Sequence, residues 1–295
     1  MKQHRFVTVD VFTGRRFGGN PLAVFPDARG ISDSDMQALA REFNLSETSF
    51  VLPPDNPTNT ARVRIFNTSH EMPFAGHPNV GTGFVLAQAA GNAGDVLRFE
   101  ELAGLVEVRI ARGPEGAIQG ATVTAPQPLS LHGAIGPELI AACIGLDQAD
   151  LVTDTHPALL ASTGNPLVFA EVLPQALGRA TPSLEGFRRA TAATPALGGR
   201  LGLYLYAQDG QRLRARLFSP LDGTWEDPAT GSAATTIAAL LLSLGANDRQ
   251  AWEISQGTEI GRPSLLRASA WRDRNGIRAD VGGDCVMMLR GVTVA

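Results

Sequence analysis

Hydrophobic and polar residues alternate in several short segments of this chain, and that period predicts strands. The first such segment is residues 5–12, in which Val7, Val9 and Val11 fall on one side. Two more, 48–52 and 62–66, follow in the first half of the chain. The remaining predicted strands lie within 104–124 around a GPEG turn, at 167–172, 201–207 and 212–219, and in the last forty or so residues, where Asn275-Gly276 marks a hairpin.

The period changes to that of a helix in residues 31–44, where apolar side chains recur at helical spacing from Met36 to Phe43. Ser32 followed by Asp35 resembles a capping box, with Asp in place of the usual Glu. The sequence therefore predicts an amphipathic helix that begins near Ser32.

Two further predicted helices, residues 78–90 and 232–244, contain no charged residue, and each is followed by a glycine. A helix without a polar face must be covered on all sides. Each is therefore predicted to be the central helix of its own domain. A buried helix start presents free N–H groups to an anion, and Gly76 and Gly231 would let a ligand approach the backbone closely.

Three short motifs occur twice in the same order, which indicates an internal duplication, although chance similarity is the alternative. The second copies lie 145, 152 and 155 positions after the first, as small insertions would produce. The pairs are GNPL at 19–22 and 164–167, RVRIF at 62–66 with RARLF at 214–218, and PFAG at 73–76 with PATG at 228–231.

The duplication predicts two similar α/β domains in tandem, residues 1–125 and 126–283, because the segment APQPLSLHGAIGPE breaks the strand pattern near residue 125. If a pseudo-twofold axis relates the halves, the two helix starts face each other across a cleft, where we expect the ligand site.

Composition excludes several classes of protein. A net charge of −4 without runs of like charge argues against a nucleic-acid or membrane partner. The first residues lack a signal-peptide stretch, so we expect a cytoplasmic protein. Cys143 and Cys285 are predicted to be reduced and buried, and neither they nor the five histidines show metal-site spacing. No GxGxxG or P-loop motif occurs.

Glu47 is the first candidate for chemistry. In an extended segment it would share a face with Leu45 and Val51. A carboxylate on an apolar face costs free energy, so we expect its pKa to rise, as suits a general acid or base. The alternative is a partly exposed or Arg-paired glutamate.

His77 and Asp227 adjoin the two helix starts. The helix dipole disfavours a protonated imidazole, so we expect a neutral, hydrogen-bonding His77. Asp227 could orient a substrate amine or shuttle a proton. Simple capping is the alternative for both residues, and an N-cap is the simplest role for Ser232.

At these residues the chain resembles the phenazine biosynthesis (PhzF-like) family, which is grouped with diaminopimelate epimerase and proline racemase. The resemblance spans nearly the whole chain. Its motifs are DVFTGRRFGGNPLAVF, NLSETSFV, RIFNTSHEMPFAGHP and EDPATGSAA. The resemblance implies an α+β fold of two pseudo-symmetric domains, each a strand-rich, barrel-like sheet around a central helix. It also implies that a last strand near 284–294 returns to the first domain, and that the protein is a homodimer.

The same resemblance implies roles for particular residues. Glu47 would be the catalytic acid/base, with His77 and Asp227 as its polar neighbours. The substrate, held by its carboxylate, would contact Asn20, Gly76, His77, Gly231 and Ser232. Related racemases carry a cysteine at each helix start, whereas AGHP and PATGS contain none, so a two-thiol mechanism is disfavoured.

The predicted function is a cofactor-free isomerase, without metal, that moves a proton at carbon in a small carboxylate substrate, similar to trans-2,3-dihydro-3-hydroxyanthranilate isomerase. Two alternatives stay open at this point. One is an epimerase or lyase of amino or hydroxy acids on the same scaffold. The other is a non-catalytic protein that binds small acids.

Overall fold

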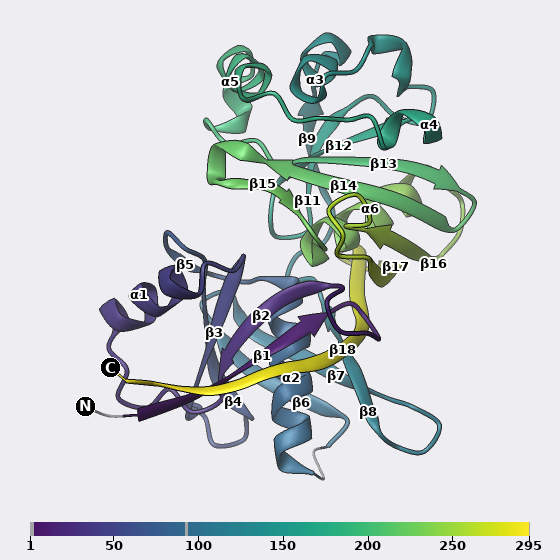
Figure 1. The fold of residues 1–295 in the computed structure, drawn as a ribbon. Coiled ribbons are helices and arrows are strands. Elements are labelled where there is room, and N and C mark those ends of the chain that lie inside the picture. Colours follow the sequence, from purple (N-terminus) through teal and green to yellow (C-terminus); the bar gives the residue numbers. More distant parts are fainter. Residues whose placement is uncertain (1–2, 92–93, 295) are drawn as a thin grey trace. The chain divides into compact units, whose positions relative to one another are not determined.

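The computed structural model describes residues 3–91 and 94–294 and divides the chain into two compact units (Figure 1). The first unit comprises residues within 1–126 and 280–295, and the second comprises residues 127–279. Whether these units are independent folding domains with the bounds expected from the sequence stays a prediction.

The strands of the first unit form a closed ring of pairings, so its sheet is barrel-like. The order around the ring is β1, β2, β3, β4, β6, β7, β8 and β18. Each strand pairs with the next, and β18 pairs with β1. Their bounds are β1 (Gln3–Val11), β2 (Asn20–Phe25), β3 (Glu47–Leu52), β4 (Ala61–Phe66), β6 (Val96–Glu101), β7 (Gly104–Arg112), β8 (Ile118–Thr124) and β18 (Gly276–Val294), and the short β5 (Glu71–Met72) pairs with β4.

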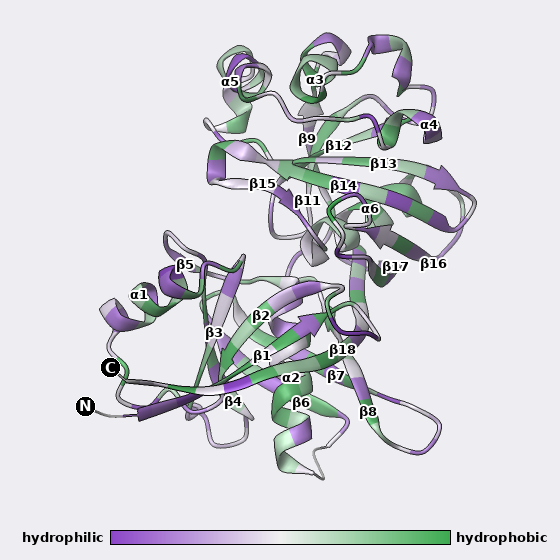
Figure 2. Cartoon of the chain, in the orientation of Figure 1, coloured by the Kyte–Doolittle hydropathy of each residue, from purple (hydrophilic) through white to green (hydrophobic). Residues whose placement is uncertain are grey.

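Helix α2 (Gly76–Ala90) lies inside this ring and packs against β1, β2, β3, β7 and β8 (Figure 1). Most of its residues are buried, as its lack of charge predicts, and Figure 2 shows no strongly polar stripe along it. Glycines allow the close packing. A Cβ at Gly81 would lie 2.6 Å from Leu22, and one at Gly83 would lie 2.6 Å from Val108.

Helix α1 (Asp33–Phe43) covers the outer side of β2, β3 and β4 with an aromatic cluster. Phe25 stacks on Phe50 at a ring distance of 4.8 Å. The Ser32 hydroxyl caps the helix by accepting from the Asp35 N–H, as predicted. The Asp35 carboxylate accepts from that same hydroxyl, so the reciprocal bond of a full capping box is not the one formed.

The second unit repeats the strand pairings of the first. β12 pairs in parallel with β13, β13 with β14 antiparallel, β14 in parallel with β16, and β16 with β17 antiparallel. The bounds are β9 (Ser130–Ala134), β10 (Leu151–Val152), β11 (Leu159–Ser162), β12 (Leu167–Val172), β13 (Leu203–Asp209), β14 (Arg212–Ser219), β15 (Thr224–Asp227), β16 (Arg249–Gln256) and β17 (Ser264–Asp273). Helix α6 (Gly231–Leu244) packs against β11, β16 and β17 and is buried along most of its length.

The second unit also carries helices that the hydrophobic pattern did not predict. Three of them cover one side of β12, β13 and β14 and form a separate apolar cluster around Phe187. These are α3 (Pro137–Ile144), α4 (Pro174–Leu177) and α5 (Leu184–Ala193), with 3₁₀ turns at Gln148–Asp150, Pro195–Leu197 and Pro220–Asp222. The first two helices are short and begin at a proline, so the segment gives a weak periodic signal.

Several predicted boundaries need correction. Both central helices begin earlier than predicted, at Gly76 and Gly231, and their N-caps are Ala75 and Thr230. Ser232 is therefore a helical residue and not the N-cap. Strand β13 starts two residues later than predicted, and β9 lies in the segment that was expected to break the pattern.

The predicted fold class is confirmed: the chain is an α/β (α+β) protein of two similar halves, each with a strand-rich sheet around a central uncharged helix. None of the helices within residues 3–91 and 94–294 is long and apolar enough to cross a membrane.

Candidate active site

Strand pairing places Glu47 at the first position of β3, next to Leu22 of β2. In the second unit the same pairing joins Val168 to Leu203, so the residue that corresponds to Glu47 is Gly202. The acidic group is therefore present in one copy of the duplicated scaffold and has no counterpart in the other.

Glu47 lies against His77 of helix α2. Glu47 Oε2 is 3.2 Å from His77 Nδ1, with the two side chains 17% and 5% exposed. The imidazole also contacts the Pro21 backbone. Its Nε2 atom is buried and has no hydrogen-bond partner among residues 3–91 and 94–294. A buried imidazole nitrogen without a partner is costly in a folded protein unless a ligand or water satisfies it.

Burial lowers the pKa of His77 to about 3, and the contact with the Pro21 backbone opposes this only in part. The imidazole is therefore neutral at physiological pH, as expected. The dominant cause is desolvation, which the expectation from the helix dipole did not include. The contact between the neutral imidazole and the Glu47 carboxyl group is therefore not an ion pair.

The surroundings of Glu47 differ from the expected alternating pattern. Leu45 lies in the bend before β3 and is only half-buried, so it does not share a strand face with Glu47. Residues 48–51 are buried on both faces of the strand, because α2 covers one side and α1 the other. Glu47 is instead the first residue of a strand that is covered by a helix on each face. The raised pKa that was expected for Glu47 stays a prediction.

In the second unit, Asp227 ends β15, three residues before the N-cap of α6. Its Oδ2 atom accepts a 2.6 Å hydrogen bond from the Thr230 hydroxyl. Gln256 holds the same turn: its Nε2 donates to the Asp227 carbonyl at 2.8 Å, and its Oε1 accepts from the Thr230 N–H at 3.2 Å. Asp227 thus acts on the N-cap residue and does not itself cap the helix.

Each GNPL motif lies at the helix start of its own unit, which explains why the motif occurs twice. In the first unit Pro21 contacts His77, and Asn20 is fully buried at the start of β2. In the second unit the Asn165 amide donates to the Ser232 hydroxyl at 3.3 Å. Neither N-cap side chain accepts a hydrogen bond from the first turn of its helix.

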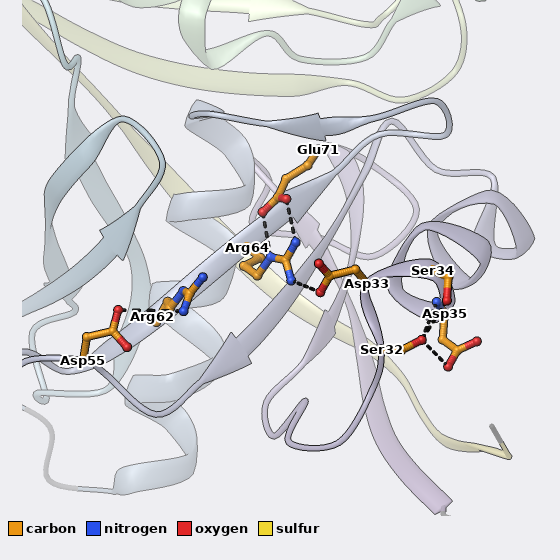
Figure 3. Close-up of polar contacts among 8 residues, drawn as sticks. All are labelled: Ser32, Asp33, Ser34, Asp35, Asp55, Arg62, Arg64 and Glu71. Carbon is orange, nitrogen blue, oxygen red and sulfur yellow. Dashed lines mark hydrogen bonds and ion pairs between the residues drawn. The ribbon is translucent and has the colours of Figure 1, made fainter.

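An Arg–Glu pair precedes each helix start. Arg216 follows Arg64 by 152 positions and Glu226 follows Glu71 by 155, which are the offsets of the repeated motifs. Arg64 donates to both carboxylate oxygens of Glu71 at 2.7 and 2.6 Å, and also to Asp33 (Figure 3). Arg216 binds Glu226 in the same way at 2.9 and 2.7 Å. Both guanidinium groups lie over a phenylalanine ring, at 5.2 and 4.8 Å from its centre. Each glutamate sits on the short strand, β5 or β15, that leads into the helix start.

Sequence reasoning missed three polar residues near these helix starts. Glu101 and Gln256 end the equivalent strands β6 and β16, and they are separated by 155 positions, the offset of the PFAG and PATG motifs. That shared offset was the available signal. Tyr204 is fully buried, and its hydroxyl has no hydrogen-bond partner in the described parts of the chain. Desolvation is the main cause that raises the pKa of Tyr204, and the charge of Asp227 adds to it. No sequence signal marked it within an apolar strand.

The cysteines and the histidines form no site of their own. Cys143 and Cys285 are buried free thiols, as predicted, and burial raises the pKa of Cys143 to about 12. Within residues 3–91 and 94–294, no group of three His, Cys, Asp or Glu side chains is placed to hold a metal ion.

Two halves, each with a strand-rich sheet around a buried uncharged helix, define a fold that an epimerase also has. A crystal structure of a hydroxyproline epimerase from Agrobacterium vitis superposes with a TM-score of 0.62 at 14% identity, over 98% of this chain and 92% of that one. A family model described as phenazine biosynthesis-like protein matches residues 9–291, so the chain belongs to the PhzF family.

Individual relatives agree with that assignment. The chain is 36% identical over 294 residues to the trans-2,3-dihydro-3-hydroxyanthranilate isomerase of Pseudomonas chlororaphis, with 99% of each chain covered. A PhzF-family protein of Bacillus anthracis has a TM-score of 0.88 at 25% identity, with both chains fully covered. The protein is thus an isomerase of the PhzF type.

Proposed function

We propose that the protein is a cofactor-independent isomerase that moves a proton between carbons of a small carboxylate, with trans-2,3-dihydro-3-hydroxyanthranilate as the first substrate to test. Glu47 is the acid/base: its carboxylate takes a proton from carbon, the C–H electron pair forms a new double bond, and the π pair of the original double bond shifts to another carbon, which takes the proton back from Glu47. The reaction needs no metal or nucleotide.

The contact between Glu47 and His77 carries this proposal. Glu47 Oε2 lies 3.2 Å from a buried, neutral imidazole, and the Glu47 side chain is only 17% exposed, so little water competes for this carboxyl group. The unpartnered Nε2 of His77 is available to a substrate polar group. Asp227, held by Thr230, is proposed as a further polar group of the reaction.

Each helix start is proposed as an anion-binding element for the substrate carboxylate. Gly76 and His77 in one unit, and Gly231 and Ser232 in the other, lie in first turns that no N-cap side chain satisfies. Free N–H groups at the positive end of a helix dipole favour a carboxylate. Asn20, buried beside the first of them, is proposed as a substrate contact.

The test is turnover of trans-2,3-dihydro-3-hydroxyanthranilate in D₂O, followed by proton NMR. Proton migration should appear as a product with a shifted double bond and, where the acid/base exchanges with solvent, deuterium at the new C–H. Glu47→Gln should abolish it, and Glu42→Gln, an exposed glutamate of α1, should not. Inversion of a stereocentre in amino or hydroxy acids, without double-bond migration, would instead make the protein an epimerase.

A homodimer is proposed from the family resemblance alone. Sedimentation equilibrium at micromolar concentration distinguishes it from a monomer, because one chain has a mass of 31.1 kDa. A mass near that of one chain would reject the proposal.

A further inference from the structure

Glu101 of the first unit and Gln256 of the second occupy equivalent positions. Both are the last residue of a strand that pairs in parallel with the strand of the RVRIF or RARLF motif. Arg62 pairs with Glu100 and Ala215 pairs with Gln256. Adding the motif offsets of 152 and 155 to positions 62 and 100 gives 214 and 255, which is the pair directly before Ala215 and Gln256. The two registers are therefore the same, and Glu101 corresponds to Gln256.

Gln256 uses its whole amide to hold the second helix start. It donates to the Asp227 carbonyl and to the Thr230 hydroxyl, and it accepts from the Thr230 N–H. In the first unit, Ala75 stands where Thr230 stands in the second, so the hydroxyl partner is missing. In the first unit Asn79 contacts the turn instead: its Nδ2 donates to the Ala75 carbonyl at 3.0 Å.

Both carboxyl oxygens of Glu101 are buried, and within residues 3–91 and 94–294 no hydrogen bond of good geometry reaches either of them. The Asn79 amide is the hydrogen-bonding side chain that faces this carboxyl group. Asn79 Oδ1 is also buried and has no partner in the same residues. Two unsatisfied buried groups therefore adjoin each other, one turn into the helix start that contains His77.

The charged groups around Glu101 do not offer it a cation. Glu101 lines two cavities, of about 550 and 190 Å³, together with Arg62, Arg64, Asp55, Glu71 and Glu100. Arg62 lies 3.7 Å from Asp55, and Arg64 is bound by Glu71 and Asp33 (Figure 3). Glu100 is half-buried, and hydrogen bonds from Asn59 and from the backbone of residues 55 and 56 lower its pKa.

We propose that Glu101 is a positioning residue of the first helix start: as a neutral carboxylic acid it pairs with the Asn79 side chain and so holds the turn at residues 75–77. The carboxyl O–H donates to Asn79 Oδ1, and the carboxyl C=O accepts the second proton of Nδ2, whose first proton already goes to Ala75. Only the neutral acid forms both bonds. A carboxylate would place two acceptors against Oδ1 and a negative charge beside an anion-binding turn.

Desolvation supports the neutral form, because burial raises the pKa of Glu101 to about 8, and hydrogen bonding by Asn79 offsets only part of that rise. The turn should therefore be intact at neutral pH and should loosen as Glu101 ionises above pH 8. The stability that the neutral acid contributes is fully present below its ordinary pKa of 4.5 and is lost as the pH rises through 8.

The experiment uses the full-length protein without ligand and follows the backbone amide NMR signals of Gly76 and His77 from pH 6 to 10. In the wild type both should shift with a midpoint near pH 8. Glu101→Gln should remove the transition, because a glutamine amide donates to Asn79 Oδ1 and accepts from Nδ2 at every pH. Glu100→Gln is the matched control, since hydrogen bonds lower the pKa of that neighbouring carboxylate, and it should leave the transition in place.

Binding of anthranilate, a simple aromatic carboxylate, adds a second measurement that rests on the proposed function. If binding requires neutral Glu101, the wild-type Kd should rise about tenfold from pH 7 to pH 9, and that of Glu101→Gln should stay constant. An amide transition that survives in Glu101→Gln, or that is absent from the wild type, overturns the role of Glu101. A transition at pH 8 that Glu101→Gln removes, together with no anthranilate binding at any pH, supports Glu101 and rejects the carboxylate site.

Discussion

The two halves of the chain share a scaffold and differ in chemistry. Strand pairing, the Arg–Glu pair and the uncharged helix recur in both units, and the strand registers match residue by residue. At the helix starts the side chains diverge. The first unit carries the titratable groups Glu47, His77 and Glu101, whereas the second has Gly202, Ser232 and Gln256 at the equivalent positions.

This difference indicates what the duplication preserved. Groups that fix the backbone before each helix were kept, because both helix starts depend on the same short strand and the same ion pair. Groups that can exchange a proton are concentrated in the first unit, with Asp227 as the acid of the second.

The largest effect is expected from Glu47→Gln, which keeps the size of the side chain and removes the proposed acid/base. Loss of such a group typically lowers the rate by about 10²–10⁴-fold. Steady-state turnover measures it. The second unit cannot compensate, because a Cβ at Gly202 would lie 2.5 Å from Leu167, so Gly202→Glu in the Glu47→Gln background should restore nothing. Turnover within tenfold of the wild type in Glu47→Gln would move the role to Asp227.

The Arg–Glu pairs should differ in their contribution to stability despite their common geometry. Arg216 and Glu226 are 8% and 6% exposed, so Arg216→Ala leaves a buried carboxylate unpaired and should cost about 3–5 kcal/mol. Glu71, the partner of Arg64, is 21% exposed and can gain water, so Arg64→Ala should cost less. Urea unfolding of both variants checks this order. Equal losses would show that burial does not set the difference.

The scaffold that the two units share could be predicted from the sequence, whereas most of the side-chain contacts that distinguish the two helix starts could not. The absence of charge on two helices, with a glycine before each, is a local signal, and it located both helix starts to within two residues. The burial of the Glu101 carboxyl oxygens depends on closure of the strand ring and on Asn79, and nothing in the sequence of the Glu100-Glu101 pair shows which of the two carboxyl groups is buried. The Arg64–Asp33 contact likewise joins segments that only the fold brings together.

His77 should make the stability of the protein depend on acid. Its pKa falls from 6.5 in its ordinary state to about 3 when folded, because burial disfavours the charged ring. A group with a lowered folded-state pKa stabilises the fold fully above 6.5, and this contribution is lost as the pH falls toward 3. The loss should be about 1 kcal/mol per pH unit in that range. Thermal unfolding from pH 7 to 4 measures it, and His77→Gln should flatten the dependence. An unchanged slope in that variant would assign the acid sensitivity to carboxylates.

The smallest effect is expected at Ser232, which occupies in the second unit the position of His77. Its hydroxyl accepts one hydrogen bond, from the Asn165 amide at 3.3 Å, and its side chain is only partly buried. Ser232→Ala removes that single neutral bond and leaves an amide that water can reach, so it should cost about 1 kcal/mol of unfolding free energy. His77→Ala should cost more, because it opens a cavity and removes the contact with Glu47. If the two variants lose equal stability while Ser232→Ala also lowers the affinity for anthranilate, the two helix starts are less specialised than their side chains indicate.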